Sequence, residues 1–381
     1  MWPGLERPFS TPKLALLVGG VVACAAFGWR PRRQPEPPTP GSRTLHVVLL
    51  LWLAPWAISS LLGGYVSIEV LVLGVFGGLW ALVLARAVCS TRAIAAAQVL
   101  GGTGVAFVTL LQTAGADPFP AAGWAPAIAG ASPRLALYGT LGNPNFVAAL
   151  MAGTAPLAAW LCVSTDGRSR WLATAALASQ VAALAATGSR GGALGLVVGA
   201  VAWFLFTAGR RRAALALAAL AVGGLLVAVS PARPLKETLS GRFYIWRVTW
   251  ARAWDQPVTG HGPGALQVLY PGWEREFRRA AHRHAVDAVF AGPQQHAHND
   301  YLEALVERGV PGAVSLAVVA GVVFVGAWSA PGRRDAAAGA AGVVALAAVA
   351  LVDFPLARPA EVALFWTAAA VAIQGRVQEG S

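Results

Sequence analysis

Long apolar runs constrain this chain more than any other feature of its sequence. About 20 mainly apolar residues are needed for a helix to cross the hydrocarbon core of a bilayer. Of the 381 residues, 56% are hydrophobic and only 12% are charged, about half the charge of a soluble domain. We therefore expect an all-α polytopic membrane protein with about eleven transmembrane helices. The apolar runs lie at 14–29, 45–62, 66–85, 93–113, 144–164, 171–187, 191–208, 213–230, 310–328, 336–353 and 360–374.

The basic residues between these runs predict the orientation of the chain, because short cytoplasmic loops carry an excess of Lys and Arg. The short connections on one side hold the larger set: Arg30, Arg32, Arg33, Arg43, Arg86, Arg92, Arg168, Arg170, Arg210, Arg211, Arg212, Arg333, Arg334 and Arg376. The short segments on the other side hold the smaller set: Arg7, Lys13, Arg134, Arg190 and Arg358. The net charge of +12 is thus explained by topology, and no nucleic-acid partner is expected.

This pattern predicts an outside N-terminus, a cytoplasmic C-terminus and one long extracytoplasmic loop. We expect about eight transmembrane helices in residues 1–230, the loop with amphipathic helices in 231–309, and about three further helices in 310–381. One short pattern opposes this orientation. Val21-Val22-Ala23-Cys24 resembles a lipoprotein cleavage site, but the consistent loops outweigh it.

The densest polar run of the chain is 296–312, which predicts a capped helix start. Asn299 or Asp300 can cap the helix, and Glu303 gives a variant of the capping box. Gly309 then stops or redirects the helix. His298 precedes the helix start, where backbone N–H groups favour anions and a neutral imidazole can take a proton from a hydroxyl. The alternative is a surface histidine near a helix start.

Three arginines are candidates for binding an anion on the outer side. Arg190 lies between Ser189 and two glycines, with no acidic residue within ten positions, and an arginine in such a setting suits a phosphate or carboxylate. Its alternative role is to anchor a helix end at the membrane surface. Arg242 and Arg247 lie in an aromatic stretch that predicts an amphipathic helix on the membrane, where simple anchoring is equally open.

Metal binding is not expected. Two His-X-His pairs, His282 with His284 and His296 with His298, raise the question of a zinc site. Carboxylates are few, and the three cysteines (Cys24, Cys89 and Cys162) all lie in or beside apolar runs. Neither a disulfide framework nor a defined zinc site is therefore favoured, and no cofactor is predicted.

Several motifs together resemble the O-antigen ligase family, whose members also include O-antigen polymerases and protein O-oligosaccharyltransferases. Two of its signatures are present: Arg-X3-Leu from Arg190 to Leu194, and His-Asn-X9-Gly-X-X-Gly from His298 to Gly312. Further landmarks lie at Gly142-Asn143-Pro144-Asn145, Gly241-Arg242 with Trp246, Gly260-X-Gly-Pro-Gly264 and Asp353-Phe354-Pro355-Leu356. Each motif alone is weak, but their order and shared membrane side make the set specific.

The resemblance implies a GT-C-type fold in the bacterial inner membrane with a periplasmic active site. It implies transfer of a glycan from an undecaprenyl diphosphate carrier to a glycan or glycolipid acceptor such as lipid A core. Fixed guanidinium groups stabilise a departing phosphate, and an imidazole deprotonates an attacking hydroxyl. The candidate catalytic residues are His298, Arg190 and Arg242, and the candidate donor- or acceptor-binding residues are Arg247, His296, Asn299 and Asn145.

Two other functions stay open from the sequence. A polymerase would use the same donor chemistry with another lipid-linked repeat as acceptor. A transporter is the alternative from a different class, and it is expected to gather polar residues and broken helices near the bilayer midplane. The polar clusters of this chain gather instead at one predicted membrane side, which favours the glycosyltransferase.

Overall fold

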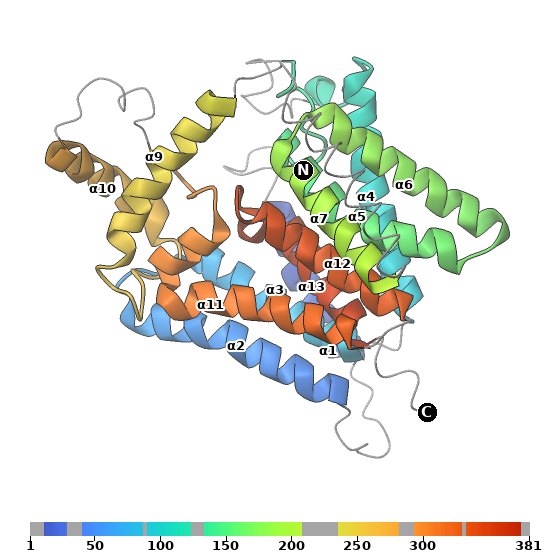
Figure 1. The fold of residues 1–381 in the computed structure, drawn as a ribbon, viewed down its shortest axis with the longest axis horizontal. Helices are drawn as coiled ribbons and strands as arrows, with labels where there is room; N and C mark the ends of the chain where they lie inside the picture. Colours follow the sequence, from blue (N-terminus) through green and yellow to red (C-terminus); the bar gives the residue numbers. More distant parts are fainter. Residues whose placement is uncertain are drawn as a thin grey trace.

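The apolar runs form helices because a helix satisfies its own backbone polar groups, which lipid cannot. The computed structural model describes residues 11–28, 40–86, 90–122, 133–207, 235–281, 293–329 and 333–374. Within these ranges all regular structure is helical (Figure 1). The α-helices are α1 (Thr11–Gly28), α2 (Pro40–Leu62), α3 (Ile68–Arg86), α4 (Thr91–Thr113), α5 (Pro144–Ser164), α6 (Gly167–Thr187), α7 (Arg190–Thr207), α9 (Leu235–Ala253), α10 (Ala265–Ala281), α11 (Asp300–Trp328), α12 (Arg334–Val349) and α13 (Pro359–Gln374).

Five of the described helices are long and apolar enough to cross a membrane: α2, α4, α5, α7 and α11. Two shorter apolar helices lie within α3 and α13. Large apolar side chains stay exposed on the outside of the bundle, including Leu61 (82%) and Leu100 (73%). Such exposure is costly in water and normal in lipid. The predicted run at 213–230 lies outside the described residues.

Small residues let the central helices approach closely, as is usual between membrane helices. A Cβ added at Gly153 of α5 would meet Leu364 of α13 at 2.7 Å, and one at Gly195 of α7 would meet Val349 of α12 at 2.5 Å. The centre of the bundle is therefore α5, α7, α12 and α13, whose ribbons lie together in Figure 1.

Several helix ends meet at one end of this bundle. Lys13 of α1 donates to the Thr140 carbonyl ahead of α5 at 2.9 Å. Gly191, at the start of α7, packs against Val352, which follows α12. Asp300 N, at the start of α11, donates to the Ala350 carbonyl at 2.9 Å. We call the end of the bundle marked by these contacts the polar end.

Helix α11 is broken at Gly309, as predicted. Gly309 has φ 68° and ψ −172°, a conformation that only glycine adopts readily. The turn at 257–264 binds the freed backbone groups: Val310 N donates to the Pro257 carbonyl at 2.7 Å, and His261 N donates to the Val306 carbonyl at 2.9 Å. The break divides α11 into a polar first part and an apolar second part.

Helices α9 and α10 form an apolar cluster beside the first part of α11 (Figure 1). Tyr244 of α9 donates to the buried Glu274 carboxylate of α10 at 2.7 Å, and Arg278 pairs with the same carboxylate. Trp246 of α9 donates its indole N–H to the Ala297 carbonyl at 2.9 Å. The amphipathic helices of the predicted loop therefore lie next to the segment that carries His298.

Candidate functional site

The segment before α11 holds His298 in an unusual backbone conformation. Asn299 caps the helix, and its Oδ1 accepts a hydrogen bond from Leu302 N at 3.0 Å. His298 has φ 53° and is the only non-glycine residue with positive φ in the part of the chain that the structure describes. Left-handed conformations of this kind cost about 1–3 kcal/mol and cluster at functional sites. The rest of the fold therefore offsets a conformational cost in order to hold this imidazole just before the start of α11.

The imidazole of His298 is turned toward a buried carboxylate. Its Nδ1 is closed to solvent and has no hydrogen-bond partner among the described residues, although 31% of the side chain is exposed. Asp353 Oδ1 lies 3.8 Å from that nitrogen, a separation longer than a hydrogen bond. Asp353 is 3% exposed. Nδ1 therefore faces Asp353, as a base that works through Nε2 requires.

Charges around Asp353 keep it ionised despite its burial. Burial raises the pKa of Asp353, but the imidazole of His298 and the guanidinium groups of Arg358 and Arg242 lower it further, so its pKa lies below the usual value. Asp353 also accepts a hydrogen bond from Phe354 N at 2.9 Å. The sequence prediction treated this loop as a family landmark and missed Asp353 as a site residue. Its acidic side chain in an apolar chain was the one available clue.

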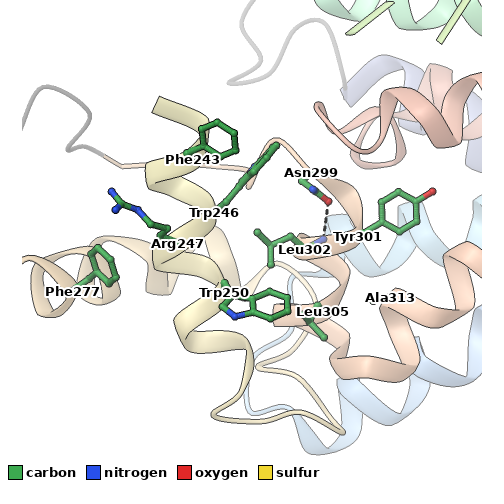
Figure 2. A pocket seen from close by; sticks show the side chains of 10 residues that line it. All are labelled: Phe243, Trp246, Arg247, Trp250, Phe277, Asn299, Tyr301, Leu302, Leu305 and Ala313. Carbon is green, nitrogen blue, oxygen red and sulfur yellow. Dashed lines mark hydrogen bonds between the residues drawn. The ribbon is translucent and has the colours of Figure 1, made fainter. Parts of the chain in front are cut away.

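Arg242 belongs to the same charge cluster, as the prediction of a shared site requires. It lies in α9, where burial lowers the pKa of its guanidinium and Asp353 opposes that shift. Arg247, five positions later, is exposed, and Figure 2 shows its side chain extending away from α11. The structure thus brings Arg242 to the His298 side and leaves Arg247 on another face of α9.

His296 has a partner of its own beside the site. Its Nδ1 lies 2.9 Å from Glu303 Oε1, and its ring stacks on Phe354 with centroids 4.1 Å apart. The other carboxylate oxygen of Glu303 accepts from Ala297 N at 2.8 Å. The predicted capping box with Asp300 is therefore wrong, because Asn299 is the cap and Glu303 reaches past it to the segment before the helix.

Asn145 and the residues before Arg190 are joined by Arg134. Arg134 donates from Nε to the Thr187 carbonyl at 2.7 Å and from a terminal nitrogen to Asn145 Oδ1. This ties the start of α5 to the end of α6, three residues before Arg190. Arg190 is half-buried and follows that connection at the polar end, where its neighbour Gly191 meets Val352.

An aromatic contact links the start of α5 to the segment before α11 at the polar end. Phe146, next to Asn145, packs edge-on against Phe354 with centroids 5.6 Å apart. The Phe354 ring in turn contacts His298, with centroids 5.0 Å apart. Phe354 therefore links the start of α5 to the segment before α11.

An open groove of about 710 Å³ runs beside this site, between α9, α10 and α11. Figure 2 shows the aromatic side chains of α9 facing α11 across it. Its lining is mostly apolar, and Asn299, adjacent to His298, is one of its few polar members. The lining residues are Phe243, Trp246, Arg247, Trp250, Phe277, Asn299, Tyr301, Leu302, Leu305 and Ala313. Such a groove suits an apolar ligand chain whose polar head group lies near His298.

No group of three or more His, Cys, Asp or Glu side chains is arranged to hold a metal within the described ranges. His296 is engaged by Glu303, and His282 and His284 lie outside the described residues. The groups that do converge are the Asp353 carboxylate, the guanidinium groups of Arg358 and Arg242, and the His298 imidazole. This set suits proton transfer and the stabilisation of a negative charge.

Comparison with known families identifies this region. Residues 173–317 match the family model described as O-antigen ligase. The match includes Arg190, Arg242 and His298, and it ends before Asp353. A comparison with curated protein sequences found no match. The resemblance seen in the sequence is therefore confirmed over residues 173–317 of this integral membrane protein, which match the O-antigen ligase family.

Proposed function

We propose that this protein is a membrane glycosyltransferase of the O-antigen ligase type. It transfers a glycan from an undecaprenyl diphosphate carrier to a hydroxyl group of an acceptor sugar, on lipid A core or a similar acceptor. The observation that carries this proposal is the His298 imidazole facing a buried, ionised Asp353, with Arg242 in the same charge cluster. The family match over 173–317 supports it.

In the proposed reaction, the acceptor oxygen attacks the anomeric carbon of the donor sugar in line with the leaving group. The bond from that carbon to the diphosphate oxygen breaks, and the configuration inverts. Nε2 of His298 takes the proton of the acceptor hydroxyl. Arg190 and Arg242 stabilise the charge that develops on the departing lipid diphosphate, while Asp353 orients the imidazole and stabilises the imidazolium that forms.

The groove beside His298 supports a place for the lipid part of the donor. Its mostly apolar lining favours a polyprenyl chain, because such a chain can occupy the groove without leaving buried polar groups unpaired. Asn299 lies both in this groove and next to His298. A chain in the groove would therefore end close to the proposed base. Arg247 and His296 remain proposed contacts of donor or acceptor, and Asn145 remains one through its place at the start of α5.

The architecture that we propose is of the GT-C type, with about eleven membrane spans and the polar end on the periplasmic side of the inner membrane. Residues 1–230 and 310–381 form the membrane parts, and 231–309 forms the extracytoplasmic loop. The shared polar end supports this arrangement, because the starts of α1, α5, α7 and α11 meet there, as outward-facing ends should in the predicted topology.

Polymerisation is the second candidate, since the family match fits either acceptor. Deletion of the gene separates the two functions. If the protein is a ligase, the deletion strain should lack the glycan on its acceptor while its lipid-linked chains keep their full length. Short lipid-linked chains in the deletion strain, or elongation of a lipid-linked oligosaccharide by purified protein without another acceptor, would favour the polymerase.

The break in α11 does not favour transport. In transporters, broken helices line a water-filled cavity near the midplane. Here the freed carbonyl of Glu307 accepts from Ser59 Oγ at 2.6 Å and from Gly262 N at 2.9 Å. Other protein groups thus bind the backbone at the break. The break therefore fixes the position of the first part of α11 and does not line a water-filled transport path.

Chelators are expected to leave transfer unchanged, because guanidinium groups carry the charge stabilisation that a metal supplies in other enzymes. The measurement is the initial rate of transfer by purified protein with and without excess EDTA. Restoration of a chelator-inhibited rate by one added divalent metal would contradict the metal-independent mechanism and point back to the histidine pairs.

A further inference from the structure

Arg358 is a buried arginine that no part of the proposed mechanism uses. It follows the Asp353 loop and is 7% exposed. Its guanidinium carbon lies 3.9 Å from the centre of the Phe146 ring and 5.1 Å from the centre of the Phe354 ring. Its Nε pairs with Glu361 of α13 at 3.0 Å. A guanidinium held between aromatic faces and one carboxylate is fixed in position.

This arginine reaches the proposed base along two routes. The first is steric, because the Phe354 ring that it covers also contacts His298. The second is electrostatic, because its charge is among those that lower the pKa of Asp353. Through both Phe354 and Asp353, Arg358 can therefore affect the orientation and protonation of the His298 imidazole.

We propose that Arg358 is a positioning residue for His298, acting through Asp353 and Phe354. Its charge keeps Asp353 ionised, so that the carboxylate can orient the imidazole. Its guanidinium also holds the Phe354 ring against the imidazole edge. This inference rests on the proposed function, since it assigns a role in the same proton transfer.

Direct contact of Arg358 with a substrate does not fit its surroundings. All three guanidinium nitrogens are closed to solvent, so a phosphate would have to displace packed aromatic rings to reach them. Glu361 Oε1 also lies 3.0 Å from Arg358 Nε, which disfavours a second anion beside that nitrogen. The charged and titratable groups facing this cluster are His298, Arg242, Asp353, Asp300, Glu361, His296 through its stack on Phe354 and, through Glu361, Lys13.

The test is the pH dependence of kcat/KM in Arg358→Gln, with purified protein in vesicles and the lipid-linked donor. Loss of the charge lets Asp353 take up a proton at higher pH, because Arg358 is among the groups that lower the pKa of that carboxyl. The carboxylate that orients His298 is then lost at higher pH, so the acid limb should move up by roughly one pH unit. Arg358→Lys keeps the charge and should leave the acid limb in place, even where the maximal rate falls.

Arg333→Gln is the matched control, because Arg333 is also largely buried (10% of its side chain exposed) and pairs with an acid, Asp335, at 3.2 Å. It lies at the opposite end of α12 from Asp353 and should leave the profile unchanged. An unmoved acid limb in Arg358→Gln would overturn the inference, as would an equal shift in Arg333→Gln.

A second variant keeps the test decisive if Arg358→Gln does not fold. Glu361→Gln removes the carboxylate that shares the charge of Arg358, so the acid limb should move to lower pH. An unmoved or raised limb would contradict the positioning role. Failure of the proposed function itself looks different, because the wild-type protein would then show no transfer at any pH.

Discussion

His298→Ala is expected to reduce transfer by about 10²–10⁴-fold, the usual contribution of a general base. The reason is positional: the fold holds this imidazole at φ 53° with its Nδ1 toward Asp353, and alanine leaves no group to take the proton of the acceptor. The measurement is the initial rate of glycan transfer by purified protein in vesicles. Membrane insertion should be unchanged, because His298 lies in a partly exposed segment before α11.

His46→Ala is the matched control for that variant. His46 is exposed near the start of α2, away from the α11 start, and its loss should leave the rate near that of the wild type. Arg190→Ala should lower the rate to a similar extent as His298→Ala, through loss of charge stabilisation. Near-normal transfer by either site variant would remove that residue from the mechanism.

Gly309→Ala should disrupt the fold around the site more than any other single methyl group in α11. The backbone conformation at Gly309 alone costs a non-glycine residue about 1–3 kcal/mol. The added Cβ would also lie 2.5 Å from the Val258 carbonyl oxygen, so the turn at 257–264 would have to move. We expect a lower unfolding temperature and a loss of transfer, because the first part of α11 carries the cap next to His298.

Gly321→Ala in the same helix provides the comparison. A Cβ at Gly321 meets no atom within 4 Å, and alanine favours a helix over glycine by about 1 kcal/mol. This variant should therefore be as stable as the wild type or slightly more so. Thermal unfolding of both variants in detergent checks the prediction, and equal stability of the two would show that the turn does not depend on the break at Gly309.

The helices were predictable because the bilayer imposes length and apolarity on each segment. The prediction of 144–164 coincides with α5, and a cap at Asn299 or Asp300 followed from their place before an apolar face; the structure shows that Asn299 is the cap. The break at Gly309 was also predictable, since glycine followed closely by proline ends a helix. These features depend on residues that are close in the sequence or on the length and apolarity that the bilayer requires. Both can be recognised in the sequence alone.

The partners of His298 were not predictable in the same way. Asp353 lies 3.8 Å from His298 but 55 positions away, and nothing in the local pattern of either residue indicates the other. Glu303 was assigned to a capping box by its spacing, yet it pairs with His296 because the backbone turns back before the helix. The aromatic sides of the groove come from α9, α10 and α11, and their approach depends on tertiary packing.

The most direct test of glycosyl transfer at the polar end is a reconstituted reaction with a labelled donor. Purified protein in vesicles is given an undecaprenyl diphosphate-linked glycan together with a lipid A core acceptor, without added metal. The proposed mechanism predicts that label moves to the acceptor with inverted configuration and that free lipid diphosphate appears in equal amount. With His298→Ala, both products should form about 10²–10⁴-fold more slowly. Label that crosses the membrane while still joined to its carrier, with no new glycosidic bond, would contradict it.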